Sequence, residues 1–410
     1  MSLGAADRIR AALNRLAGDM PILGIAISGG GDSTALLHIA ADWARDRTLM
    51  AATVDHGLRP DSAVEAKQAG EAATALGIPH VVLRWTRETE AGNLMAEARD
   101  ARLRLLSGWA QRNNLPAVLL GHTRDDVAET LMMRLARGAG IDGLAEMAEW
   151  RDAFGLRWIR PMLGVGRAEL REWMQARDIG WIDDPSNQNT DFERVRVRKA
   201  MADLGVDTMA LAKVAANLSE ARDALALYAA EICRDARATR GTLILPRGPI
   251  RRAPAEIRRR IVVAACRWIT GADYPPRRAA VSHALNGLAG GSRVTLDGAM
   301  LEPDGERLHV IREPAAAMRA PSVDGASPVW DNRWRIEGLE AGQEVSAVGL
   351  EDLVRLPWRN AGLDRDEAAG TPAIRENGKL VAAPLLQAGS RVTCLPSRDI
   401  ADFQTMLVRH

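Results

Sequence analysis

The sequence predicts an α/β protein that begins with a doubly wound, parallel five-stranded sheet, continues with a helical region and ends with a small α+β domain. The first part is indicated by short apolar runs that alternate with segments of helical period. Continuous apolar strands of this kind are typical of a parallel sheet covered by helices on both faces. A Gly-rich turn follows the first apolar run, and Arg-rich helical segments replace the alternation in the second half.

The alternating pattern sets the order of the expected elements. We expect strands at Ile22–Ile27, Met50–Val54, Val81–Trp85, Ala117–Leu120 and Leu156–Ile159. We expect helices between them at Thr34–Arg45, Ser62–Leu76, Leu94–Asn113, Asp125–Arg137 and Arg167–Arg177. Together these segments define a first domain, residues 1–204.

The second half is expected to contain two further domains. Residues 205–314 open with the Ala/Leu-rich segment "ALAKVAANLSEARDALALYAAEI", which predicts a long helix, and close with the hairpin-like "RVTLDGAMLEPDGERLHVIREP". The Ala/Pro-rich stretch "PAAAMRAPSVDGASP" is interpreted as a linker. Residues 329–410 then form a small domain with short strands.

The composition limits the class of protein. A net charge of +1 gives no global basic signature, so a nucleic-acid surface would have to be local. Cys233, Cys266 and Cys394 are too widely spaced for a disulfide framework or a zinc site, and we expect buried thiols in a reducing cytosol. No apolar run approaches the ~18 residues that cross a bilayer. We therefore expect a cytoplasmic protein without membrane contact.

The turn after the first strand predicts an anion site, because free backbone N–H groups and the positive end of a helix meet there. Its residues are Ser28, Gly29, Gly30, Gly31, Asp32, Ser33 and Thr34. The hydroxyl groups and the glycine amides can approach phosphate oxygens, and Asp32 can hold Mg²⁺ beside them. The turn is not a Walker loop, because it has no Lys before Ser33. It is not a dinucleotide-binding fingerprint, because Thr34 stands where that motif has its third Gly. An ordinary tight turn capped by Ser33 or Thr34 is the alternative.

The segment "GHTRDDVAET" predicts a second group of polar side chains after the fourth strand. Asp126 and Glu129 are three residues apart and share a helix face, where two carboxylates suit an ammonium group or a metal. Asp125 is interpreted as complementing the helix dipole, and His122 has no assigned role. If the first and fourth strands are neighbours where the strand order reverses, this group and the Gly-rich turn share one crevice.

These motifs resemble a known family. "SGGGDS" is similar to the pyrophosphate loop of the PP-loop superfamily of N-type ATP pyrophosphatases, a Rossmann-like fold. Together with "VDHGLR", "IRPML" and "DDPSNQNTDFERVRVR", it resembles the tRNA(Ile)-lysidine synthetase family. The resemblance is dense over residues 22–198 and thinner in "WDNRWRIEG" and "PAIRENGKLVAAPLL". The chain departs from the family at Val195, where Asn is usual.

The resemblance implies a ligase that adenylates the wobble cytidine of the CAU anticodon of tRNA(Ile) with Mg²⁺ and ATP. Lysine then displaces AMP to form lysidine. It implies that Asp126 and Glu129 receive the lysine, and that Asp55 and His56 join Ser28–Thr34 at the nucleotide. The expected catalytic residues are the carboxylate that holds Mg²⁺, Asp32, and the cations expected near the phosphates, which are Arg99, Arg102, Arg194 and Arg198. Expected partners are tRNA(Ile), free L-lysine and a second copy of the chain in a homodimer.

Two other functions remain open at this stage. A ligase acting on a small acyl substrate would form AMP without RNA, and the long Arg-rich second half argues against it. An RNA-binding protein with a degenerate catalytic domain is disfavoured by the intact motif residues. A tRNA thiolase would need cysteine chemistry, and no Cys precedes Cys233. Arg251–Arg252, Arg258–Arg260 and Arg277–Arg278 are the expected tRNA phosphate contacts, with solvated helix faces as the alternative.

Overall fold

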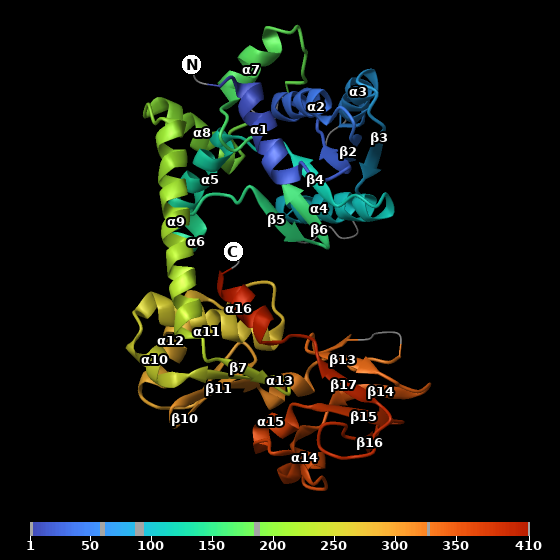
Figure 1. Ribbon diagram of the computed structural model, residues 1–410, viewed down its shortest axis with the longest axis vertical. Helices are drawn as coiled ribbons and strands as arrows, with labels where there is room; N and C mark the ends of the chain where they lie inside the picture. The colour runs from blue at the N-terminus through green and yellow to red at the C-terminus, as the bar shows by residue number, and fades with distance from the viewer. Residues whose placement is uncertain (1–2, 58–61, 87–93, 184–188, 326–328, 409–410) are drawn as a thin grey trace. The chain divides into compact units, whose positions relative to one another are not determined.

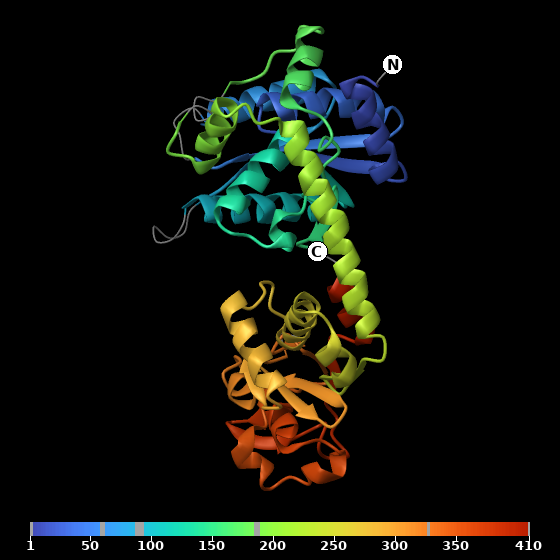
Figure 2. The same cartoon turned by 90° about the vertical axis from the view of Figure 1, so that its left-hand side faces the viewer.

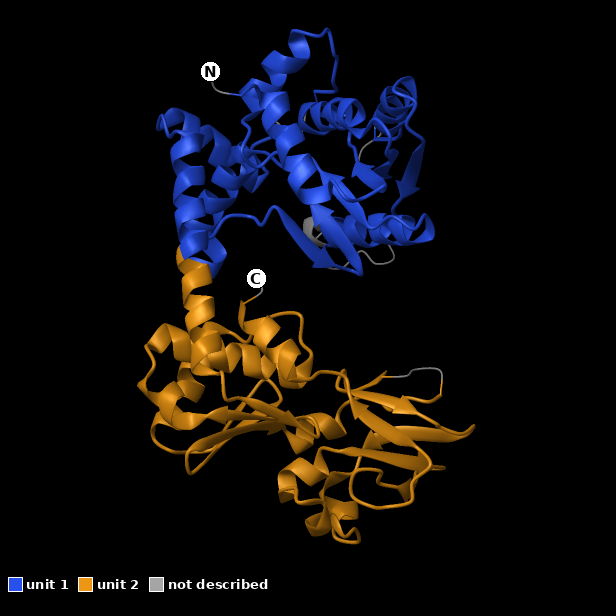
Figure 3. Cartoon of the chain, viewed as in Figure 1, with its two compact units in different colours: residues 1–220 blue, residues 221–410 orange. Residues whose placement is uncertain are grey.

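The computed structural model describes residues 3–57, 62–86, 94–183, 189–325 and 329–408. It divides into two compact units, residues 1–220 and 221–410 (Figure 3). The boundary between the units falls inside one long helix, α9 (Thr208–Ile232), which Figure 2 shows as a continuous rod. The long helix expected at the start of the second half is therefore confirmed.

The first unit is built on a six-stranded sheet in the order β3-β2-β1-β4-β6-β5 (Figure 1). All five expected strands are present, and they pair in parallel. Their bounds are β1 (Ile22–Ala26), β2 (Thr48–Asp55), β3 (His80–Arg84), β4 (Ala117–Leu120) and β6 (Leu156–Ile159). The sixth strand, β5 (Trp150–Ala153), was not expected. It is an antiparallel edge strand of only four residues, "WRDA", with no continuous apolar run.

Helices cover both faces of this sheet, which confirms the doubly wound α/β class. Side chains of α1, α2, α3 and α7 pack with Leu23 and Ile25 on one face. Leu106, Trp109 and Ala110 of α4 pack on the other face. The helices of this unit before α9 are α1 (Ala5–Ala17), α2 (Gly31–Ala44), α3 (Ser62–Ala75), α4 (Leu94–Arg112), α5 (Arg124–Ala136), α6 (Ile141–Leu144), α7 (Arg167–Gln175) and α8 (Glu193–Asp203).

The strand order reverses at β1, which pairs with β2 on one side and with β4 on the other. The neighbouring placement of the first and fourth strands is thus confirmed. Because parallel strands end at the same edge of the sheet, the turns that follow β1 and β4 meet at this edge. Such a reversal is the usual ligand position in an open α/β sheet.

The second unit begins with a five-stranded antiparallel sheet in the order β7-β8-β11-β10-β9. The hairpin expected near residues 293–314 is confirmed by the antiparallel pairs β9–β10 and β10–β11. The elements of this part are β7 (Arg237–Thr239), β8 (Thr242–Pro246), α10 (Arg247–Arg252), α11 (Ala255–Thr270), α12 (Arg278–Ala289), β9 (Val294–Leu296), β10 (Ala299–Asp304) and β11 (Arg307–Arg312).

The remainder of this unit contains two three-stranded sheets, in the orders β12-β13-β17 and β14-β15-β16. It includes α13 (Pro314–Met318), β12 (Val329–Trp330), β13 (Trp334–Glu337), β14 (Gln343–Ala347), α14 (Gly349–Leu353), the 3-10 helix Trp358–Ala361, α15 (Arg365–Ala369), β15 (Pro372–Glu376), β16 (Lys379–Ala382), β17 (Thr393–Pro396) and α16 (Ile400–Val408). The linker interpretation is wrong for α13, because Ala316 and Ala317 are buried. The small side chains pack closely there.

The last helix packs into the first part of the second unit. Phe403 and Leu407 of α16 are buried in the same core as Ile257 and Ile261 of α11. The indole N–H of Trp268 donates to the carbonyl oxygen of Asp399 at 2.9 Å.

The structure also bears on the cysteines and on membrane-spanning segments. All three cysteines are buried and free, and burial raises each thiol pKa to about 12, as expected for core thiols. Among the described residues, no helix is long and apolar enough to cross a membrane.

Candidate active site

The turn between β1 and α2 is closed by hydrogen bonds among its own residues. The Ser33 hydroxyl donates to the Gly30 carbonyl at 2.9 Å and accepts from the Ser28 N–H at 3.1 Å. The Thr34 hydroxyl donates to the Gly29 carbonyl at 3.1 Å. Ser33 and Thr34 are buried and shape the loop, whereas Ser28 is exposed. Helix α2 begins at Gly31, so its free N–H groups face this turn.

Gly29 adopts a backbone conformation that favours glycine. Its φ is +80°, and a Cβ would lie 2.4 Å from Cδ1 of Ile182. The Ile182 N–H also donates to the Gly29 carbonyl at 2.9 Å. Ile182, in the segment before α8, therefore fixes the Gly-rich loop through this backbone hydrogen bond. The neighbouring residues Pro185, Ser186 and Asn187 of the "DDPSN" motif lie outside the described residues, as does Arg59 of "VDHGLR".

The turns after β1 and β4 touch each other. A Cβ on Gly121 would lie 3.2 Å from the Ser33 Cα and 3.3 Å from the Asp32 carbonyl carbon. A side chain here would require the neighbouring backbone to shift by a few tenths of an ångström, so glycine favours this close approach. The structure therefore brings the Gly-rich loop and the carboxylate-bearing helix α5 to one place, as the sequence predicts.

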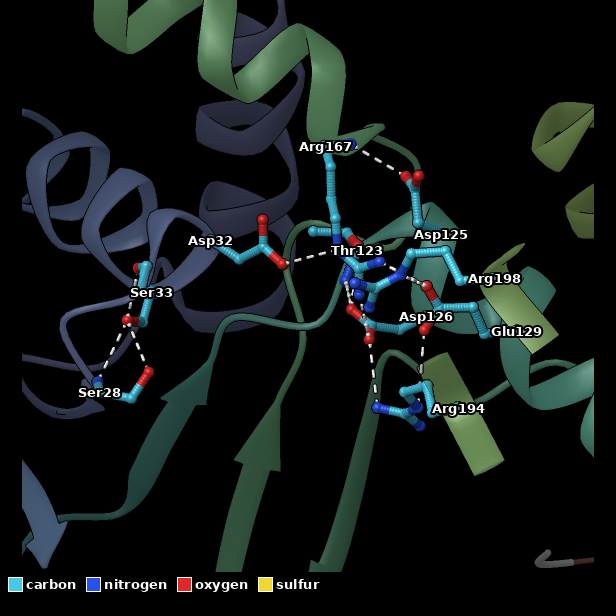
Figure 4. Close-up of polar contacts among 11 residues, drawn as sticks. Ser28, Asp32, Ser33, Thr123, Asp125, Asp126, Glu129, Arg167, Arg194 and Arg198 are labelled. Carbon is cyan, nitrogen blue, oxygen red and sulfur yellow. Dashed lines mark hydrogen bonds and ion pairs between the residues drawn. The ribbon is translucent and has the colours of Figure 1, made fainter. Parts of the chain in front are cut away.

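Helix α5 starts with a capping box at Thr123. Oδ2 of Asp126 accepts the Thr123 N–H at 2.8 Å and its hydroxyl at 2.9 Å. The other oxygen, Oδ1, points toward Arg167 and Arg194 (Figure 4). Asp126 therefore caps the helix and also reaches the site. Asp125, which we expected only to complement the dipole, accepts the backbone N–H of Arg167 at 2.9 Å.

Three carboxylates converge on one guanidinium, that of Arg167 at the first position of α7. Its Nε donates to Asp32 at 3.0 Å, Nη2 to Asp126 at 2.7 Å and Nη1 to Glu129 at 2.5 Å (Figure 4). The side chains of Asp126 and Glu129 are only 7% and 2% exposed, and that of Arg167 is 16% exposed. Buried carboxylates of this kind need a cationic partner.

The charges in this cluster shift one another. Burial raises the pKa of Asp126, but Arg167 and the Thr123 N–H outweigh it and hold that pKa below its ordinary value. Burial raises the pKa of Asp32, and Arg167 compensates only in part. Burial lowers the pKa of Arg167, yet Asp126 and Glu129 raise it above the ordinary value. Arg167 therefore stays charged and keeps Asp126 ionised.

Arg194 and Arg198 reach the same carboxylates from α8. Nε of Arg198 donates to Glu129 at 2.8 Å, and Nη1 of Arg194 donates to Asp126 at 3.4 Å. Both arginine side chains are 40% exposed. The unusual Val195 lies within the first turn of this regular helix.

The other expected site residues lie at the ends of β2 and β4 and on α4. Asp55 accepts the Gly57 N–H at 2.9 Å, which lowers its pKa together with a bond from Ser62. Burial and then the charge of Arg102 lower the pKa of His56. Burial lowers the pKa of His122 to about 4, and Arg102 contributes to that shift as well. Arg102 is therefore electrostatically close to both histidines.

The arginines around α4 repel one another. Burial and the charge of Arg99 lower the pKa of Arg102 and of Arg134. Burial, Arg151 and Arg99 lower the pKa of Arg160 to about 10. This part of the unit therefore carries an excess of positive charge, which favours a polyanionic ligand.

Arg167 is not among the site residues expected from the sequence. A signal was present, because Arg167 is the first residue of a helix, where a cation opposes the dipole.

A second correction concerns the expected tRNA contacts. Arg260 is buried and pairs with Glu256 at 3.2 Å, so it supports α11 and is not exposed to a ligand. Arg251, Arg252, Arg277 and Arg278 are exposed as expected.

The fold and this loop define a PP-loop ATP-using enzyme, since residues 5–204 match the family described as PP-loop domain. Over the full length, the chain is 40% identical to the tRNA(Ile)-lysidine synthase of Ruegeria pomeroyi, with 100% of both chains covered. It is 29% identical to that of Wolbachia pipientis wMel, with 88% of each covered. The chain belongs to the tRNA(Ile)-lysidine synthase family.

Proposed function

We propose that this enzyme joins L-lysine to the wobble cytidine of a tRNA(Ile) that carries a CAU anticodon, with ATP converted to AMP and pyrophosphate. The proposal rests on family membership and on one observation in particular. The Gly-rich loop and the two buried carboxylates lie at the same edge of the sheet. Gly121, in the turn before the carboxylate-bearing helix, is in close contact with the backbone of the loop. A site for an anion therefore adjoins a site for an amine, which a two-step ligation needs.

In the first step, the C2 oxygen of the cytidine attacks the α-phosphorus of ATP. An oxygen–phosphorus bond forms, the bond to the β-phosphate oxygen breaks, and pyrophosphate leaves. The loop Ser28–Ser33 would hold the leaving phosphates through its amides. Arg99, Arg102, Arg194 and Arg198 would stabilise the negative charge that develops. The mutual repulsion around Arg102 supports this role, because a triphosphate would relieve it.

In the second step, the lysine side-chain nitrogen attacks C2. The new carbon–nitrogen bond replaces the carbon–oxygen bond, and AMP leaves. Asp126 and Glu129 would hold the ammonium group beforehand and accept the proton released as the bond forms. Their burial strengthens this interaction, since the local dielectric is low.

Asp32 is the residue that fits a magnesium ion. Among the described residues, no group of three or more His, Cys, Asp and Glu side chains could hold a metal unaided. Mg²⁺ is commonly bound by one or two carboxylates together with substrate phosphates, which matches a single carboxylate beside the loop. The ion would neutralise phosphate charge when bound. Asp55 and His56 would contact the remainder of the nucleotide.

Residues 205–314 and 329–410 would bind the body of the tRNA and set its register. Arg251, Arg252, Arg277 and Arg278 are exposed and suited to phosphate contacts, which position a nucleic acid without reading its sequence. These contacts should make the affinity for tRNA fall as salt concentration rises.

Radiolabelled lysine provides the decisive test. The full-length chain is incubated with Mg²⁺, ATP, labelled lysine and a tRNA(Ile) transcript with a CAU anticodon. A transcript with uridine at the wobble position is the control. Lysine should enter the first transcript only, and AMP should form only when it is present. AMP formation without RNA would instead support a ligase for a small substrate, and a folded protein inactive on both transcripts would contradict the proposal.

A further inference from the structure

Arg167 lies where the substrate ammonium of the proposed reaction would bind. Its guanidinium donates to Asp126 and Glu129, the two carboxylates proposed to hold lysine, and also to Asp32 of the phosphate loop. We propose that Arg167 is an internal competitor of the amine substrate, and that nucleotide binding draws it away and opens the amine site. This inference rests on the proposed function and adds a residue that determines when lysine can bind.

Asp126 has no oxygen available while Arg167 is in place. Oδ1 accepts from Arg167 at 2.7 Å and from Arg194 at 3.4 Å, and Oδ2 accepts both the N–H and the hydroxyl of Thr123. Oε1 of Glu129 accepts from both Arg167 and Arg198, whereas Oε2 lies 3.5 Å from Nε of Arg194 and has no hydrogen-bond partner. A second cation beside this buried pair would be repelled by Arg167 and would find no free acceptor on Asp126. Lysine can therefore be held by both carboxylates together only if it displaces the guanidinium.

The nucleotide offers Arg167 another partner. Asp32 follows the glycines of the phosphate loop, and Nε of Arg167 already contacts it at 3.0 Å. A triphosphate on this loop places negative charge next to the guanidinium, while a cation held at Asp32 weakens the existing contact. Both effects favour a move of Arg167 from Asp126 and Glu129 toward the phosphates. Coupling of this kind is reciprocal, so lysine must strengthen nucleotide binding by the same factor.

The backbone of Arg167 is held independently of its side chain. Its N–H donates to Asp125 at 2.9 Å, and the Gly166 N–H donates to Glu169 at 3.1 Å. Helix α7 should therefore keep its start in Arg167→Ala. Arg124 offers a matched control, because its side chain is 12% exposed, lies in the same region and pairs with Glu169 at 3.0 Å.

Calorimetric titration with L-lysine tests the inference on the full-length chain, with and without Mg²⁺ and a non-hydrolysable ATP analogue. For the unaltered protein and for Arg124→Ala, the analogue should lower the Kd for lysine at least tenfold. For Arg167→Ala, lysine should bind at least tenfold more tightly than to the unaltered protein when no nucleotide is present. The analogue should then change that Kd less than twofold.

An unchanged or weaker lysine Kd in Arg167→Ala without nucleotide would overturn the inference and make Arg167 a purely structural ion-pair partner. The proposed function would survive that result. Failure of lysine to bind any of these proteins, with or without nucleotide, would overturn both. A thermal melt checks folding, and if Arg167→Ala lacks a cooperative transition, Arg167→Gln keeps a long polar side chain without the charge and carries the same expected tenfold change.

Discussion

Glu129→Gln is expected to separate the two proposed steps of the reaction. The glutamine keeps the shape of a side chain that is only 2% exposed, but removes the negative charge that faces Arg167, Arg194 and Arg198. A hydrogen bond to a charged group contributes about 1.5–3 kcal/mol. Loss of that interaction with the lysine ammonium should raise the KM for lysine roughly 10- to 150-fold. Formation of the tRNA adenylate should fall less than lysine incorporation, since Asp32 and the phosphate loop are unchanged while Arg194 and Arg198 lose one partner.

The assay measures lysine incorporation against lysine concentration, and AMP and pyrophosphate release in parallel, with a CAU-anticodon tRNA(Ile). Glu169→Gln is the matched control, because Glu169 also pairs with two arginines, Arg8 and Arg124, outside the carboxylate cluster. It should leave the KM for lysine unchanged. Equal losses in pyrophosphate release and lysine incorporation in Glu129→Gln, at an unchanged KM for lysine, would refute the assignment of Glu129 to the amine.

Three further predictions concern single residues. Asp32→Ala should reduce tRNA-dependent pyrophosphate release to below about 1% of the unaltered enzyme, measured by the same assay, because the carboxylate beside the phosphates is lost. Gly121→Ala should lower that rate about tenfold with an unchanged circular dichroism spectrum, since its Cβ would lie 3.2 Å from the Ser33 Cα and push the two turns apart. His122 has a folded pKa of about 4, below its ordinary value of 6.5, so the unfolded chain binds a proton that the folded chain does not. The stability present above pH 6.5 should fall by about 2 kcal/mol between pH 7 and pH 5, and urea unfolding should show a smaller loss in His122→Asn.

Elements with a strong local pattern could be predicted from the sequence. Ala117–Leu120 and Leu156–Ile159 are strands with the expected bounds because short apolar runs bounded by turns leave few other interpretations. The edge strand Trp150–Ala153 has two polar residues among its four and is specified by pairing with its neighbour. The helix Pro314–Met318 was interpreted as linker because its composition is Ala and Pro, and only tertiary packing explains its burial.

The site shows the same division between local and long-range information. The sequence spacing places Asp126 and Glu129 on one helix face, and the Thr123-to-Asp126 spacing is itself a capping-box signature. The contacts of Arg167 with Asp32 and Asp126 span 135 and 41 residues of sequence. Residue patterns over single segments cannot reveal such contacts. A cation at the N-terminus of a helix is a local anomaly that indicates a partner elsewhere, but it does not name the partner.

Charge balance explains how the site can bury its carboxylates and still bind substrates of both signs. Asp32, Asp126 and Glu129 carry three negative charges, and Arg167, Arg194 and Arg198 pair with them. An unpaired buried carboxylate would be destabilising by several kcal/mol. Under the proposed function, the arginines pair with the triphosphate, while the carboxylates pair with the ammonium group and the magnesium ion. Each buried charge then keeps a partner throughout, provided that the nucleotide arrives before lysine, which is the order that displacement of Arg167 requires.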